Sequence, residues 1–274
     1  MLSAELNAIK HSKRSKITIL FLFITIIVGE AFSWYGNYYL FWDYARYKHM
    51  ALSYKNIYHP TMTTFLAGNT SGQFLQIIII WLLPMYLLLI STHRLVDQSQ
   101  AESNYVTLSR FSKINRYLET SQLTQFIVFM SLFLILFGFD FLLAELLFHN
   151  GQFFMDLENS IKYSHLLGLE LQHPNLTYLI YSVIVSAAFA LFAVVVQVLV
   201  LTLKRPILIY PISLGIWFFM VAMPASSTYF IQPFIEYDWG TYLSSLISYL
   251  LICSIIIIGG NFWLKLRGKY VYFS

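Results

Sequence analysis

Charged residues are scarce along this chain. Asp, Glu, Lys and Arg make up 11% of its 274 residues, whereas hydrophobic residues make up 58% and the mean hydropathy is +0.65. A water-soluble domain of this length needs more charged side chains on its surface. The composition therefore excludes an ordinary soluble protein and indicates one that is embedded in lipid.

Cysteine is nearly absent, since Cys253 is the only one. A single thiol excludes an internal disulfide framework and any metal site built from several cysteines. Because Cys253 lies within a long apolar run, we interpret it as a packing residue.

The sequence also lacks the motifs of membrane enzymes and nucleotide-binding proteins. It contains no HExxH, no clustered histidines, no GxSG nucleophile turn and no GxxxxGK[ST] phosphate loop. We therefore expect no catalytic residue, metal ion or cofactor in this chain. Any ATP that drives the protein would bind a separate chain.

Six long apolar runs are present instead, each near or above the ~20 residues that cross a bilayer. They predict an all-α polytopic membrane protein with one transmembrane domain over residues 1–274. The first run is long, contains Glu30 and lacks a small-residue cleavage site, so we expect a permanent span rather than a signal peptide. The runs are Ile17 to Trp34, Phe74 to Ser91, Leu123 to Leu147, Leu176 to Leu203, Ile207 to Phe230 and Tyr242 to Leu264.

Basic residues alternate between the two sides of these runs. Four of the 17 Lys and Arg residues (Arg46, Lys48, Lys55 and Lys162) would lie on one side and all the others on the opposite side. Short cytoplasmic loops retain Lys and Arg, so we predict that both termini are cytoplasmic. The net charge of +4 is then explained by contact with anionic membrane lipids, and no nucleic-acid partner is expected.

The predicted cytoplasmic loop between the second and third spans has two faces at 100° per residue. One face carries apolar side chains (Leu108, Phe111, Ile114 and Leu118) and the other carries cations (Arg110, Lys113 and Arg116). This pattern predicts an amphipathic helix. It either lies on the inner leaflet as an anchor or docks on a partner protein.

Several short motifs follow one another in a characteristic order. They are Phe65-Leu66-Ala67-Gly68-Asn69, Leu83-Pro84, Glu102, Ser109-Arg110, Ser112-Lys113, Tyr117, His173-Pro174 and Lys204-Arg205. In this order the chain resembles the type-2 permease subunits of bacterial ABC exporters, especially six-span permeases of Gram-positive bacteria. Ser103 stands where that family usually has glycine, and Glu119 or Thr120 stands near a usual lysine.

The resemblance implies a permease in the bacterial plasma membrane that works as a homodimer or beside a sister permease. It implies that a separate ABC ATPase subunit hydrolyses ATP and docks on the amphipathic helix, which acts as a coupling helix. The coupling residues would be Glu102, Arg110, Phe111, Lys113 and Tyr117. The exported substrate would be an amphipathic or antimicrobial peptide.

Three acidic residues fall within the predicted outer halves of spans, namely Glu30, Asp140 and Glu145. Carboxylates at this depth are costly unless they are paired, protonated or facing water, so they are candidates for a translocation path. The alternative is interfacial snorkelling or an interhelical hydrogen bond. Pro84 and Pro224 are expected to bend the second and fifth spans, either as static kinks or as hinges, and Pro84 is also a candidate for gating.

The predicted outer loop from Trp34 to Pro60 is rich in Trp, Tyr and Phe. Such rings favour the headgroup boundary, so we expect an extension of the first span followed by a re-entrant or interfacial segment. The functional alternative is that this loop forms a gate or a receptor surface for an amphipathic substrate.

Two other functions compete with the permease hypothesis. One is a stand-alone membrane immunity or assembly factor that binds a partner without transport. The other is a membrane enzyme, which would have to bring together distant polar residues such as Glu30, Asp140 and His149.

Overall fold

The computed structural model describes residues 2–51, 53–67, 74–92, 114–154, 167–203, 205–232 and 238–272. These residues form one bundle of helices, and no strand longer than a single bridge occurs among them. Four helices are long and apolar enough to cross a membrane: Lys13–Tyr47, Asn115–Leu147, Pro174–Leu203 and Trp239–Leu266. The prediction of an all-helical, membrane-embedded chain is confirmed at this level.

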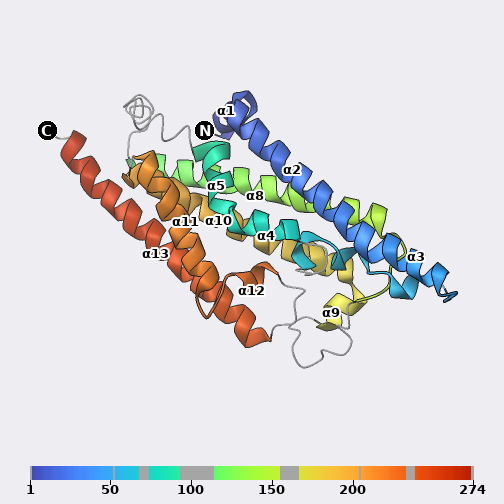
Figure 1. The fold of residues 1–274 in the computed structure, drawn as a ribbon. Coiled ribbons are helices and arrows are strands. Elements are labelled where there is room, and N and C mark those ends of the chain that lie inside the picture. Colours follow the sequence, from blue (N-terminus) through green and yellow to red (C-terminus); the bar gives the residue numbers. More distant parts are fainter. Residues whose placement is uncertain are drawn as a thin grey trace.

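Both chain termini lie at the same end of the bundle (Figure 1). We call this the terminal end, and the opposite end, toward which α2 runs, the distal end. Helix α1 (Leu2–His11) lies at the terminal end and is joined at Ser12 to α2 (Lys13–Trp34). The Ser12 hydroxyl caps α2 by accepting a hydrogen bond from the Ser15 N–H at 3.2 Å.

Helix α2 continues without a break through the π-helical turn η1 (Tyr35–Tyr39) into α3 (Leu40–Tyr47). The continuous helix has 35 residues, and at 1.5 Å per residue it is about 52 Å long. This exceeds the ~30 Å of hydrocarbon, so part of a helix of this length would extend beyond it. The predicted extension of the first span is confirmed.

The second predicted span is a broken helix. Helix α4 (Phe74–Trp81) is separated from α5 (Leu83–Leu87) by Leu82, and α5 and the π-turn η5 (Leu88–Thr92) continue toward the terminal end. Pro84 has no N–H to donate and its ring crowds the preceding turn, which explains the break. The predicted interruption at Pro84 is confirmed.

The fifth predicted span is shorter than expected. Helix α11 (Pro206–Ala222) ends two residues before Pro224, because Met223 adopts the extended backbone that a residue preceding proline favours. The chain then turns into the short helix α12 (Thr228–Ile231). Pro224 thus ends this helix and does not bend it, and the proline inside α11 is Pro211.

Helix α10 (Pro174–Leu203) is the centre of the bundle, with α8 (Ile114–Leu147) and α13 (Trp239–Tyr272) packed beside it. Asp238 caps α13, because its Oδ1 accepts hydrogen bonds from the N–H and the hydroxyl of Thr241. The hydroxyl bond holds the pKa of the Asp238 carboxyl below its usual range. At Gly260 of α13 an added Cβ would lie 2.2 Å from Val198 Cγ1 of α10. This glycine therefore permits the close contact of the two helices.

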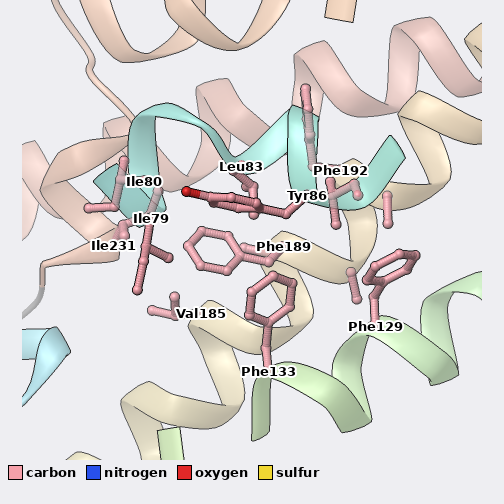
Figure 2. Packing of buried hydrophobic residues seen from close by; sticks show 14 of the residues in the cluster. Ile79, Ile80, Leu83, Tyr86, Phe129, Phe133, Val185, Phe189, Phe192 and Ile231 are labelled. Atoms are coloured by element: carbon pink, nitrogen blue, oxygen red, sulfur yellow. The ribbon is translucent and has the colours of Figure 1, made fainter. Parts of the chain in front are cut away.

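The core is aromatic and lies between α4, α5, α8 and α10 (Figure 2). The rings of Phe133 and Phe189 meet edge to face at 4.9 Å, and Phe192 packs on Trp217 at the same distance. By contrast, α2 and α13 expose long apolar side chains, such as Ile24 and Ile255, on their outer faces. Such faces are expected where helices meet lipid.

Candidate functional site

Two acidic side chains from helices far apart in the sequence meet inside the distal half of the bundle. Glu30 of α2 and Asp140 of α8 are each only 2% exposed, and their carboxyl groups lie within hydrogen-bonding reach of each other. Helices α2 and α8 pack side by side, which brings the two residues together. We call Glu30 and Asp140 the carboxyl pair.

Asp140 is held by donors from two other parts of the fold. Its Oδ2 accepts a hydrogen bond from the Phe65 N–H at 2.7 Å. The Tyr178 hydroxyl of α10 lies 3.5 Å from the same oxygen and donates more closely to the Phe137 carbonyl, at 2.9 Å. One oxygen of Asp140 therefore links α8, α10 and the loop that contains Phe65.

Glu30 is less well satisfied. Its Oε2 is buried and has no hydrogen-bond partner, and within the described part of the chain no Lys, Arg or His forms an ion pair with either carboxyl. Two ionised carboxylates in contact inside a protein repel strongly, so such a pair is stable when it shares one proton.

The loop that supplies Phe65 is itself buried. We call residues 59–67 the docked segment; it contains the 3₁₀ turns η3 (Pro60–Met62) and η4 (Phe65–Ala67), and all eight residues from Pro60 to Ala67 are buried. Its threonines bond to its own backbone: Thr63 Oγ1 donates to the Pro60 carbonyl and Thr64 Oγ1 to the Thr61 carbonyl, each at 2.8 Å. The polar backbone groups of this irregular segment are thus paired within the protein.

His59 fixes the start of the docked segment. Its Nδ1 accepts from the Thr61 N–H at 3.3 Å, and its ring stacks on Phe154 at 4.8 Å. Burial lowers the pKa of His59 to about 4, so the imidazole is neutral at physiological pH.

A short segment after α8 holds the preceding residues. The His59 N–H donates to the Phe153 carbonyl at 2.8 Å, and the Phe153 N–H donates to the Ile57 carbonyl at 2.8 Å. At Gly151 an added Cβ would lie 2.0 Å from the Tyr58 backbone oxygen. Only glycine permits this approach, which holds Tyr58, the residue before the docked segment, close to the distal end of α8.

A second polar cluster lies at the terminal end. Ser91 Oγ of η5 donates to Glu5 Oε1 of α1 at 2.5 Å, and Gln125 Nε2 of α8 donates to Ser91 Oγ at 2.7 Å. The Ser15 hydroxyl of α2 donates to the Ile90 carbonyl at 2.5 Å. These hydrogen bonds join η5 to α1, α2 and α8.

The first turns of α8 are fastened to its neighbours. Tyr117 and Leu118 form a small buried cluster with Leu201 of α10, against which Leu264 of α13 packs. One turn later, Gln122 Nε2 donates to Asn261 Oδ1 of α13 at 2.6 Å, and Gln197 Nε2 of α10 donates to Ser121 Oγ at 2.5 Å. Movement at the start of α8 would therefore reach α10 and α13 directly.

The predicted site residues are distributed unevenly over these features. Tyr117 lies in the α8 cluster, and Glu30 and Asp140 form the carboxyl pair. Glu145 is half-buried and is joined to neither of them, while His149 is exposed beyond the helix end, so the trio of Glu30, Asp140 and His149 is not assembled. Four coupling residues lie outside the described residues: Glu102, Arg110, Phe111 and Lys113.

Sequence reasoning missed the partners of these residues. The docked segment carries no charge, and its threonines gave no reason to expect it beside Asp140. The amides of Gln125, Gln197 and Asn261 lie within apolar runs, which is a signal for interhelical hydrogen bonds that could have identified the terminal-end contacts.

Comparison with known proteins yields one informative relative. Over 202 residues the chain is 29% identical to the protein named "Uncharacterized protein YybM" of Bacillus subtilis (strain 168), covering 73% of this chain and 80% of that protein. No family model matches the chain, and no solved structure matches it. The name of that relative states no function, so the function has to be argued from the geometry.

Proposed function

We propose that this chain is the membrane-spanning permease subunit of an ABC exporter in a bacterial plasma membrane, with six membrane passes and both termini in the cytoplasm. The broken helix α4–η5 and the short α11 would supply the two passes beyond the four long helices. A separate ATPase subunit would hydrolyse ATP, and the permease would pair with itself or with a sister permease. An amphipathic peptide is the substrate class that suits the aromatic distal surface.

The observation that carries this proposal is the attachment of the start of α8. The amphipathic sequence with Arg110 and Lys113 continues into the first turns of α8, where Tyr117 and Leu118 are buried against α10 and α13. A partner that pulls on this sequence would displace three helices together, because packed elements move as rigid bodies. A membrane anchor without transport needs no such connection.

Polar groups inside the bundle add support. The carboxyl pair and the buried threonines lie on the distal side, and the contacts of Glu5, Ser91 and Gln125 lie on the terminal side. Ionisable and polar residues at membrane depth are expensive and are typical of substrate or ion pathways. An exporter needs polar surfaces at both ends that can become exposed in turn.

Co-purification from the native host tests the proposal. Wild type in mild detergent should retain an ABC ATPase identified by mass spectrometry, and the double variant Arg110→Glu/Lys113→Glu should retain at least about tenfold less, since like-charge contacts at an interface cost several kcal/mol. The matched control is Arg46→Glu/Lys48→Glu, which makes the same charge change on the predicted opposite side and should leave retention unchanged. A folded wild type that retains no ATPase would contradict the proposal and favour the stand-alone membrane factor.

A further inference from the structure

We propose that the carboxyl pair of Glu30 and Asp140 is a proton-binding site, and that its proton controls whether the docked segment stays in the bundle. The proposal goes beyond export by an ATPase and does not depend on it. It begins from three facts in one place. Two buried carboxyl groups lie within hydrogen-bonding reach of each other, Glu30 Oε2 is buried without a partner, and a loop amide donates to Asp140.

The chemistry of the site favours a proton over a metal ion. No group of three or more His, Cys, Asp or Glu suited to a metal ion occurs among the residues that the structure describes. Hard cations such as Ca²⁺ and Mg²⁺ need about six oxygen ligands, whereas Asp140 Oδ2 is already occupied by the Phe65 N–H. A proton needs only one oxygen from each carboxyl group, and the two groups lie within hydrogen-bonding reach of each other.

The protonated pair carries a single negative charge. One carboxylic acid donates to the other carboxylate, and the Phe65 N–H stabilises the charge that remains on Asp140. When the proton leaves for water, both groups become anions and repel across the contact between α2 and α8. The single loop amide cannot compensate two charges, so separation of the helices releases the docked segment.

Other titratable groups around the pair do not account for such a switch. Tyr178 of α10 is a phenol whose hydroxyl already donates to the Phe137 carbonyl. His59, at the start of the docked segment, has a pKa lowered by burial to about 4, so it stays neutral from pH 5 upward. Glu145 lies on α8 but is not joined to the pair. The response above pH 5 is therefore assigned to Glu30 and Asp140.

Maleimide labelling of the full-length protein in lipid nanodiscs tests the proposal. In a Cys253→Ala background, Thr63→Cys reports release of the docked segment, and the exposed Asn56→Cys corrects for the intrinsic pH dependence of thiols. The labelling rate of Thr63→Cys divided by that of Asn56→Cys should rise with pH. The rise should be up to about tenfold per pH unit, which is the slope for one linked proton. Glu30→Gln, which stays neutral and can donate to Asp140, should keep the ratio low at every pH.

Glu145→Gln is the matched control, because it removes a half-buried carboxyl from the same helix, and it should preserve the wild-type profile. The proposal would be overturned if the labelling ratio still rose with pH in Glu30→Gln. It would also be overturned if the ratio changed with sodium concentration and not with pH. Infrared spectroscopy of wild type provides a test that needs no folded variant at position 30 or 140. The carbonyl band of a protonated carboxylic acid should disappear over the same pH range in which labelling rises, and its absence throughout that range would also overturn the proposal.

Discussion

Replacing Asp140 by leucine is expected to destabilise the protein more than any other single substitution in the distal half. Leucine removes the acceptor of the Phe65 N–H and leaves that buried amide unpaired. Loss of one partner of a buried hydrogen bond to a charged group costs about 3 kcal/mol. Thermal unfolding in detergent should therefore show a clearly lower midpoint than wild type.

Two further variants separate the causes of this effect. Asp140→Asn retains a carbonyl oxygen for the Phe65 N–H, so its cost should be about 1 kcal/mol. Glu145→Leu removes a carboxyl that is only half-buried on the same helix and should leave the midpoint close to that of wild type. Equal losses for Asp140→Asn and Asp140→Leu would show that the hydrogen bond to the docked segment contributes little.

Replacing Trp217 by phenylalanine is expected to have the next largest effect. Pro84 cannot donate to the Ile80 carbonyl four residues before it, and the Trp217 indole N–H of α11 donates to that carbonyl instead, at 2.7 Å. Trp217 is fully buried. The variant leaves the carbonyl unpaired and a gap in the core, for a combined cost of about 3 kcal/mol.

A double-mutant cycle isolates the part due to the broken helix. Alanine at position 84 supplies the missing N–H, so Trp217→Phe should cost about 1 kcal/mol less in a Pro84→Ala background than in wild type. Trp81→Phe is the control, because Trp81 is 47% exposed and its loss should be nearly neutral. If the shifts in unfolding midpoint caused by Trp217→Phe and Pro84→Ala simply add in the double variant, a direct link between Trp217 and the break at Pro84 is contradicted.

The gross architecture follows from hydrophobic patterning because lipid imposes strong rules on it. Backbone groups in hydrocarbon must be paired internally, so long apolar runs become helices. This predicts α2, α8, α10 and α13, and Pro84 predicts the break in the second run. The extent of α11 was misjudged because the apolar run up to Phe230 continues past Pro224, whereas the backbone before a proline turns away from the helix.

The carboxyl pair could be predicted only in part. Glu30 and Asp140 stand out as acids within apolar runs, but which helices lie side by side depends on packing between distant segments. Glu145 has the same sequence signal as Asp140 and yet lies half-buried and apart from the pair, because five residues along a helix turn a side chain to another face. The contact between the docked segment and Asp140 could not be predicted, because its donor is a backbone N–H, which nearly every residue type has.

The two ends of the bundle have complementary roles in the proposed transport cycle. At the terminal end, Tyr117 and Leu118 join the start of α8 to α10 and α13. At the distal end, α8 carries Asp140, which binds the docked segment. One continuous helix of 34 residues therefore connects the predicted ATPase contact to the docked segment.

The most direct test of this account is the exposure of the distal end while the ATPase turns over. In membrane vesicles that contain the complex, Thr63→Cys in the Cys253→Ala background would be labelled by maleimide with and without ATP. ATP hydrolysis should change the labelling rate severalfold, and a hydrolysis-deficient ATPase should abolish the change. Labelling that is the same with ATP, without ATP and with the deficient ATPase would contradict the claim that this chain is the moving subunit of an ATP-driven exporter.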